Sequence, residues 1–524
     1  MKYTAIHKKI TKLALVIMVL IFSFSCEDYL EESLTTEVNQ EFLYKTTDGL
    51  KAGVKALYVI NRDSYIKREF WWGESYEALV LVARADISVP MNGTLSNFGK
   101  YSAAVSATNY TLSHHWKKFN AIANKATSII VAAEAMVDIT ESDRKQIISE
   151  AKFFRANSYF VLYRIYNNIY VTEEAITPEN AFDLVLDKSS EEDIFDLLSR
   201  DLDYGIENLN WTDQFGRVTK GAAKHLRAKV AMWEGDWPEA KLQAETLISD
   251  GPHDLVNVAD VFDDKMNHDE QLFTLQYEND VNGGGNRNMV NWNLITQYNK
   301  LPGMIRSEEY GGKGASFLLP NNYLLGLLSE DPNDARDDNN YFVTEYRYND
   351  AANVPAGFNV GDIVPNPYAV TSSLYYKRLH PSCKKYSEEG TEPDNTTKKS
   401  NFMVYRLAET YLIAAEANMR MVAGTGLFYL NKVRERAGAA DATVINETAI
   451  LDERARELSF EGQRWFTLKR MGINVLRHQI QTYAGDDGYK DDARTNFQDH
   501  YINFPIPQSQ LDFLGPNYPQ NTGF

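Results

Sequence analysis

The sequence is poor in cysteine and histidine and lacks the familiar catalytic motifs. It has two Cys and nine His in 524 residues, and no CxxC, HExxH, GxSxG or P-loop pattern. Zinc binding, nucleophilic catalysis and phosphate binding in these motifs need those residue types at those spacings. We therefore expect no catalytic residue, no metal and no cofactor.

Basic residues are also outnumbered, at 54 Lys and Arg against 72 Asp and Glu, which gives a formal net charge of −18. Such a chain would repel a polyanion, so a nucleic acid partner is excluded and a highly anionic glycan is a poor ligand. The content of 44% apolar and 12% aromatic residues, with 31 Tyr, is that of a globular protein with a sizeable core.

The one long apolar run lies at residues 13–24, behind four lysines, and it is short for a membrane span. This pattern predicts an export signal over residues 1–25. The run ends in Ser-Phe-Ser-Cys at 23–26, which resembles a lipobox, so Cys26 is expected to carry lipid; an unlipidated secretory signal is the alternative. Removing residues 1–25 takes away four lysines and no acid, which changes the charge from −18 to −22.

Apolar residues recur every three or four positions over several long segments, which predicts a mainly α-helical fold. Helices are expected over 115–137, over 150–166 with Ser142 or Asp143 as the cap, over 189–209, and after Gly216. In 228–252, Ala228 and Ala240 allow a close helix crossing around a turn at 235–236, as in a tetratricopeptide repeat. Residues 408–433 resemble a second such hairpin, although any alanine-rich hairpin would show the same pattern.

Between residues 279 and 400 the helical pattern gives way to Gly, Asn, Pro and Tyr, and only 317–328 reads as a helix. A loop region of this length is usually functional. Four aspartates lie in it, at 331, 334, 337 and 338, without the glycine and the final glutamate of a calcium loop, so we interpret them as a solvated turn.

Ten short segments, in this order and spacing, resemble the SusD/RagB family of outer-membrane lipoproteins. They are CEDYL at 26–30, EAKFFRA at 150–156, GRVTKGAA at 216–223, YRLAE at 405–409, EA at 416–417, NKVRERAG at 431–438, ERAREL at 453–458, EGQRWF at 461–466, PIP at 505–507 and QNTGF at 520–524. The resemblance covers nearly the whole chain after the signal. It implies a tetratricopeptide-like helical hairpin scaffold with an irregular, loop-rich ligand-binding part. The expected division is 1–25 signal, 26–278 N-terminal part, 279–400 variable part and 401–524 C-terminal part.

The charged segment 453–464 is expected to be one amphipathic scaffold helix. Glu457 and Glu461 could be taken for paired catalytic carboxylates, but the neighbouring arginines would lower both pKa values and leave no acid poised to donate a proton. The PIP tail cannot be helical and should lie extended against the core.

A neutral glycan is bound by exposed aromatic rings and by amides or carboxylates. Aromatic residues that fit this requirement lie in the early segment and in the variable part: Trp71, Trp72, Tyr76, Trp292, Tyr298, Tyr310 and Tyr375. The family fixes their regions and not the individual positions, and any one of them could be a core aromatic instead. Trp71 and Trp72 cannot both face a core in a strand, because adjacent side chains point to opposite sides.

The resemblance implies a lipid-anchored, surface-exposed protein of the outer membrane that binds an oligosaccharide or polysaccharide and delivers it to a SusC-like TonB-dependent porter. Two alternatives stay open: an oligopeptide carrier of the same import system, with fewer stacking rings, and an assembly scaffold that binds no nutrient. The sequence does not name the sugar.

Overall fold

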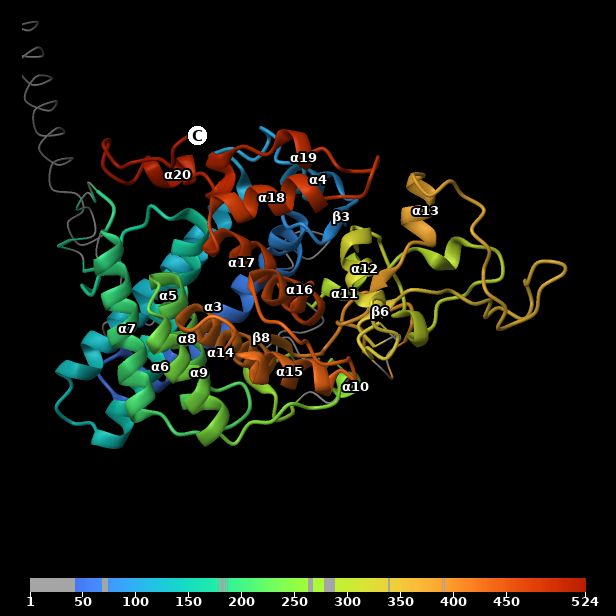
Figure 1. Ribbon diagram of the computed structural model, residues 1–524. Coiled ribbons are helices and arrows are strands. Elements are labelled where there is room, and N and C mark those ends of the chain that lie inside the picture. Colours follow the sequence, from blue (N-terminus) through green and yellow to red (C-terminus); the bar gives the residue numbers. More distant parts are fainter. Residues whose placement is uncertain are drawn as a thin grey trace, which may run out of the picture.

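The computed structural model describes residues 43–67, 74–177, 179–180, 183, 185, 187–262, 267–277, 288–337, 340–388, 390 and 392–524. Helices dominate and strands are short (Figure 1), so the prediction of a mainly α-helical fold is confirmed. Among the described helices, none is long and apolar enough to cross a membrane.

Long helices of the N-terminal half pack side by side in chain order. They are α3 (Thr47–Tyr65), α5 (Tyr110–Ala135), α6 (Glu141–Tyr166), α7 (Glu191–Asn208), α8 (Lys220–Glu234) and α9 (Trp237–Asp250). The predicted helices are confirmed, but the cap of α6 is Thr140, whose hydroxyl accepts from the Asp143 amide at 3.1 Å. Ser142 and Asp143 already belong to the first helical turn. From Ile147 onward almost every side chain of α6 is buried, which makes α6 the central helix of this half.

The two predicted hairpins exist and pack on each other. The second is formed by α14 (Leu407–Met421) and α15 (Leu427–Arg436). Ala240 and Ala244 of α9 and Ala414 and Ala417 of α14 are fully buried in one cluster, so the small side chains allow the two helices to approach closely. The turn after α8 is made by Gly235, whose φ of 86° favours glycine.

The charged segment is two helices and not one, which corrects the prediction. The chain forms α16 (Glu447–Leu458), turns with Phe460 at φ 63°, and resumes as α17 (Arg464–Arg470). Buried cations take the carbonyl oxygens that a continuing helix would need: Arg406 Nη2 donates to the Glu457 carbonyl at 2.7 Å, and Lys385 Nζ donates to the Ser459 carbonyl at 2.9 Å.

Shorter elements complete the C-terminal half. They are α18 (Ile473–Tyr483), α19 (Ala493–Asn496), η4 (Asp499–Ile502) and α20 (Gln508–Leu511). The PIP tail is extended, as predicted: Ile506 is fully buried, and the Phe504 amide beside it donates to the Ile165 carbonyl of α6 at 3.0 Å.

The described strands pair only as two-stranded antiparallel sheets. The pairs are β1 (Ile66–Lys67) with β2 (Glu74–Ser75), β3 (Ser88–Pro90) with β5 (Leu318–Pro320), β4 (Gln271–Leu275) with β8 (Phe402–Arg406), and β6 (Phe342–Val343) with β7 (Ser382–Cys383). The β4–β8 pair joins the two halves, because β8 leads directly into α14. A π-helix, η1 (Tyr76–Leu81), and the short helices α4 (Gly93–Gly99) and α10 (Val258–Val261) lie between the larger elements.

The variable part forms a lobe that projects to the right in Figure 1. Its elements, besides β5, β6 and β7, are α11 (Val290–Leu294), η2 (Tyr298–Lys300), η3 (Glu308–Tyr310), α12 (Asn322–Ser329) and α13 (Ser373–Arg378). The helix predicted over 317–328 is therefore half right, since β5 comes first and α12 follows it. The outer part of the lobe has its own small core, which contains four buried tyrosines, whereas α11, β5 and α12 pack into the main core.

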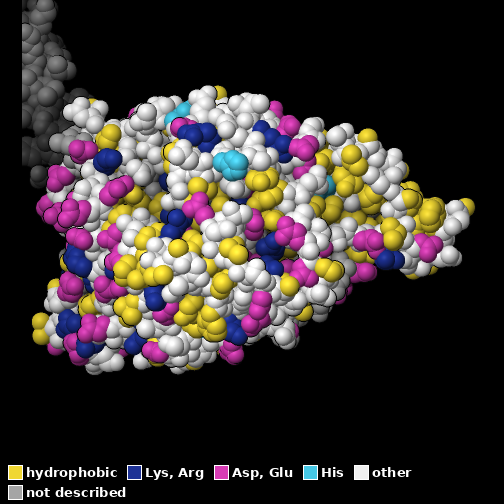
Figure 2. All heavy atoms as spheres, viewed as in Figure 1, with side chains coloured by type: hydrophobic (Ala, Val, Ile, Leu, Met, Phe, Trp, Pro, Cys, Tyr) yellow, Lys and Arg dark blue, Asp and Glu magenta, His cyan; other side chains and the backbone are white. Residues whose placement is uncertain are grey.

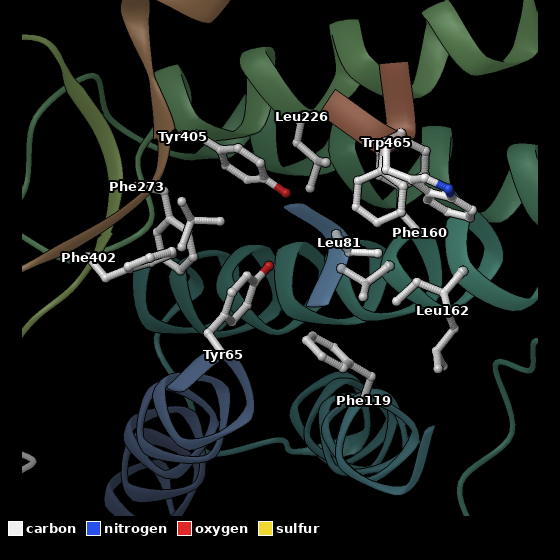
Figure 3. Packing of buried hydrophobic residues seen from close by; sticks show 14 of the residues in the cluster. Tyr65, Leu81, Phe119, Phe160, Leu162, Leu226, Phe273, Phe402, Tyr405 and Trp465 are labelled. Atoms are coloured by element: carbon white, nitrogen blue, oxygen red, sulfur yellow. The ribbon is translucent and has the colours of Figure 1, made fainter. Parts of the chain in front are cut away.

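The main core lies between the two halves and is rich in aromatic rings (Figure 3). The hydroxyls of Tyr65 and Tyr405 point toward one another (Figure 3), and both are hydrogen-bonded to Asn157. Tyr405 Oη donates to Asn157 Oδ1 at 2.5 Å, and Asn157 Nδ2 donates to Tyr65 Oη at 3.4 Å. Because α3, α6 and β8 share this contact, the helical framework supports the lobe as one rigid base.

Candidate functional site

Two of the predicted ligand-binding aromatics lie in the interior of the lobe. Tyr298 is 0% exposed and Tyr310 is 2% exposed, and both rings pack against Tyr346 at centroid distances of 5.6 and 5.3 Å. Their hydroxyls are satisfied internally: Tyr298 donates to the Ser307 carbonyl at 3.2 Å, and Tyr310 donates to the Arg347 carbonyl at 3.2 Å. The expectation that these two rings are exposed platforms is corrected.

Trp292 and Tyr375 are only partly buried. Trp292 lies on α11, with its ring 5.4 Å from that of Phe317, and its carbonyl accepts from the Ala315 amide at 2.7 Å. Tyr375 lies on α13, where its ring meets His380 edge-on at 5.3 Å. Both residues sit on short helices held by loops of the lobe, so part of each ring can reach a ligand.

The other predicted site residues are not placed. Trp71, Trp72 and Cys26 lie outside the described residues, and so does the side chain of Tyr76, the first residue of η1. The paired strands β1 and β2 hold the two ends of the segment that carries Trp71 and Trp72 next to each other. Their roles stay predictions.

The lobe contains an open groove of about 360 Å³. Its lining combines apolar side chains with amide and charged groups, namely Asn299, Met304, Ile305, Arg306, Glu392, Pro393 and Asp394. We call this the lobe groove. Arg306 and Asp394 form an ion pair in it, and Glu392 adds a second carboxylate, so the lining carries one formal negative charge.

At the apolar edge of the lobe groove, hydrogen bonds to the backbone of Ile305 hold its side chain toward solvent. Asn349 clamps Ile305 on both sides: its Oδ1 accepts from the Ile305 amide at 2.8 Å, and its Nδ2 donates to the Ile305 carbonyl at 3.0 Å. The Ile305 side chain is 51% exposed as a result. On the loop that follows, Phe358 packs on Tyr348 at 5.3 Å and is 40% exposed. Figure 2 shows apolar side chains along this projecting lobe.

No sequence pattern predicts that Ile305 and Phe358 are exposed, because both are ordinary apolar residues in a region without periodicity. Their exposure follows from the pairing of distant loop segments, such as the Tyr348 amide with the Asp362 carbonyl at 3.0 Å. Neither residue was a predicted site residue.

The two glutamates that resemble paired catalytic carboxylates, Glu457 and Glu461, form buried ion pairs. Glu457 is fully buried and accepts from Arg406 at 2.6 Å and from Arg336 at 3.1 Å, with Arg436 in contact as well. Burial alone raises the pKa of Glu457, but Arg436, Arg406 and Arg336 outweigh it and hold the pKa well below its usual range. The predicted direction is confirmed for Glu457, and this residue has no proton to donate near neutral pH.

The aspartate cluster is not a wholly solvated turn. Asp334 is buried and accepts from Arg336 at 2.7 Å, while Asp331 is partly buried and accepts from the Asn333 amide at 2.9 Å. Among the described residues, no group of three or more His, Cys, Asp or Glu side chains is arranged to hold a metal ion. Asp338 lies outside the described part of the chain.

Known proteins show the same combination of a helical-hairpin framework and a loop-built lobe. The family model described as "SusD family" matches residues 269–524. SusD-like protein P25 of Formosa agariphila is 26% identical over 540 residues, which cover 95% of this chain and 96% of that protein. The starch-binding protein SusD of Bacteroides thetaiotaomicron is 29% identical over 143 residues, 27% of this chain and 25% of that one.

Among solved structures, a laminarin-binding SusD-like protein superimposes with a TM-score of 0.70 at 21% identity, over 92% of this chain and 100% of that chain. This likeness concerns the fold. Fold and sequence together define a protein with a framework of helical hairpins and a lobe built largely from loops. Residues 269–524 match the SusD family, and relatives named SusD-like are similar to this chain over nearly its whole length.

Proposed function

We propose that this protein is a cell-surface lipoprotein that binds an oligosaccharide or polysaccharide through its lobe and delivers it to a partner SusC-like TonB-dependent porter. The observation that carries the proposal is the lobe groove, a surface that combines apolar side chains with amide and carboxylate groups and in which Asp394 balances the charge of Arg306. Neutral sugars offer this combination of apolar ring faces and hydroxyl groups. Relatives named for binding starch and laminarin support the same ligand class.

The anchor and the compartment belong to the same proposal. Lipid on Cys26 would hold the protein at the outer membrane. The other cysteine, Cys383, is fully buried in β7, and burial raises the pKa of its thiol to about 12. A buried, protonated thiol is a poor partner for a disulfide, which is consistent with a Cys26 that is modified instead.

Binding to a panel of neutral polysaccharides, measured by affinity electrophoresis and calorimetry, tests the ligand class. Trp292→Ala, Tyr375→Ala, Trp71→Ala and Trp72→Ala should each weaken binding of the retained glycan by about 1 kcal/mol where the ring stacks on it. Phe513→Ala is the control, because Phe513 is 76% exposed near the C-terminus, away from the lobe. Failure of the protein to retain any glycan would refute the proposal.

A peptide ligand is the second candidate, and one observation favours it. The rings of Tyr298 and Tyr310 are buried, while the exposed edge of the lobe carries Ile305 and Phe358. Apolar side chains of this kind form pockets for the side chains of an extended peptide. Retention of a mixed oligopeptide library, combined with no retention of the glycan panel, would favour this candidate.

A further inference from the structure

A second concave site lies on the helical framework. It is a cavity of about 190 Å³ between the α7–α8 loop and the chain that runs from the end of α9 into β4. We call it the framework cavity. Its lining comes from residues 211–219 and 252–274, none of which belongs to the lobe groove. No predicted site residue lies in it.

The loop that forms one wall is firmly held. Gly216 adopts a φ of 83°, and a Cβ there would meet the Gln276 side chain at 2.3 Å, so only glycine fits this turn. Arg217 next to it is ion-paired with the buried Glu150 of α6. The Val218 amide donates to Tyr58 Oη of α3 at 2.9 Å. The cavity is therefore preformed by the segments GRVTKGAA and EAKFFRA, which the lobe groove does not use.

Two aromatic side chains border the cavity. Trp211 is partly buried against the core, whereas Phe215 is 60% exposed at the tip of the loop. Each ring can offer an apolar face next to polar groups of the cavity. Rings of this type stack on the C–H faces of sugars and leave the hydroxyl groups free for hydrogen bonds.

The polar lining is rich in hydrogen-bond acceptors. His253 places Nδ1 3.1 Å from the Asp269 carbonyl oxygen, to which it donates, and burial lowers the pKa of His253, so the ring stays neutral and Nε2 is an acceptor. His253 Nε2 and Gln271 Oε1 are both buried without a hydrogen-bond partner among the described residues. Asp213 adds an exposed carboxylate at the rim.

Acceptors of this kind select a ligand that brings donors. Hydroxyl groups can donate to His253 Nε2 and Gln271 Oε1 and can also accept from Arg217, which lines the cavity with a buried Nε that has no hydrogen-bond partner among the described residues. A carboxylate or phosphate could pair only with Arg217, whose charge Glu150 already balances, and would face the two acceptors and the Asp213 charge. The volume lies below the range of about 300–1,000 Å³ that holds drug-sized ligands, which limits the occupant to about one ring.

From this geometry we propose that the framework cavity is a separate subsite for one neutral pyranose ring, with Trp211 and Phe215 as stacking surfaces and His253 and Gln271 as hydroxyl acceptors. The proposal rests on the proposed function, since it assigns the cavity to the same ligand class. It adds a contact on the helical framework, at a different place from the lobe.

The test uses the methyl glycosides of glucose, galactose, mannose and xylose as probes, with binding measured by calorimetry and saturation-transfer NMR. At least one glycoside should bind saturably, and Phe215→Ala should weaken it about fivefold, the equivalent of one stacking contact. Phe428→Ala is the matched control, because Phe428 is 62% exposed on α15 and should leave binding unchanged. Gln271→Ala tests the acceptor independently of stacking and should also weaken binding.

The proposal is overturned if none of the four glycosides binds, if Phe215→Ala binds as wild type does, or if methyl glucuronide binds as tightly as the neutral probes. These outcomes differ from failure of the proposed function. Polysaccharide retention that depends on Trp292 or Tyr375 and not on Phe215 would keep the lobe and remove the subsite. Glycoside binding that depends on Phe215, without retention of any polysaccharide, would keep the subsite and remove the polysaccharide site proposed in the lobe.

Discussion

At the scale of single residues, the most unusual feature is the number of charges in the interior. Arg406 alone contacts three carboxylates, those of Glu270, Glu457 and Glu461, at 2.8, 2.6 and 2.7 Å. Buried ion pairs contribute little net stability compared with apolar packing, but removing one partner leaves an uncompensated charge. This network connects β4, β8 and α16, so it fixes which elements meet between the two halves.

Glu457→Gln should therefore be strongly destabilising. The substitution leaves Arg406, Arg436 and Arg336 with one negative charge fewer among them, and the expected loss is about 3–5 kcal/mol of unfolding free energy. Denaturant unfolding followed by circular dichroism measures it. Glu435→Gln is the control, because Glu435 pairs with Lys432 on an exposed helix face and its loss should not shift the curve measurably. Equal unfolding curves for Glu457→Gln and wild type would contradict the role of the network.

The lowered pKa of Glu457 also predicts that the stability of the fold depends on pH. The pKa of Glu457 is well below its ordinary value of 4.5, so the folded state binds fewer protons than the unfolded state as the pH falls below about 4.5. The stabilisation is complete above that value and is lost as the pH drops toward the pKa of the folded state. Melting temperature measured between neutral and acid pH should fall in this window, and the fall should be smaller in Glu457→Gln. A parallel fall in both proteins would assign the acid sensitivity to other groups.

The sequence contains the charged residues of 453–464, but it does not predict that their side chains are buried. Opposite charges three and four positions apart are common on exposed helices. These side chains are buried because Arg336 and Arg406, which come from distant segments, pack against them and pair with them. Likewise, Tyr298 and Tyr310 lie in a segment with the composition of a binding loop. Their burial depends on mutual packing with Tyr346, a contact that local sequence does not encode.

At the scale of elements, periodicity predicted the long helices and the two hairpins, since an apolar stripe depends on the sequence alone. It failed where tertiary contacts decide the end of a helix. The break between α16 and α17 depends on Arg406 and Lys385, which lie far away in sequence. Short elements such as β5 and α12 were merged for the same reason.

The crossing of α9 and α14 gives an element-scale prediction. Ala414 is fully buried among alanines of both helices, so Ala414→Leu inserts a branched side chain where two backbones approach. Overpacking of this kind should cost about 1–3 kcal/mol, measured by chemical denaturation. Ala121→Leu is the matched control, because Ala121 is exposed on α5. Ala414→Leu with unchanged stability would show that the two hairpins are not in close contact.

At the scale of the whole molecule, a framework held by buried charge and aromatic packing carries a lobe whose small core is its own. Loops on such a base can vary without unfolding the scaffold. Composition predicted a loop-rich part over 279–400, but it could not predict the lobe groove or the framework cavity, because both are formed by segments that are distant in the chain.

How the whole molecule is held in its compartment gives the last prediction. If Cys26 carries lipid, its acyl chains, each buried methylene worth about 0.8 kcal/mol, hold the protein at the membrane. Cys26→Ser should move the protein from the membrane pellet to the supernatant after cell fractionation, as followed by immunoblotting. Cys383→Ser removes the other cysteine, which is buried in β7, and should stay in the pellet. A Cys26→Ser protein that still sediments with membranes after a high-salt wash would show that something other than this lipid anchors it, and the adjoining apolar run at 13–24 would then be the first segment to test.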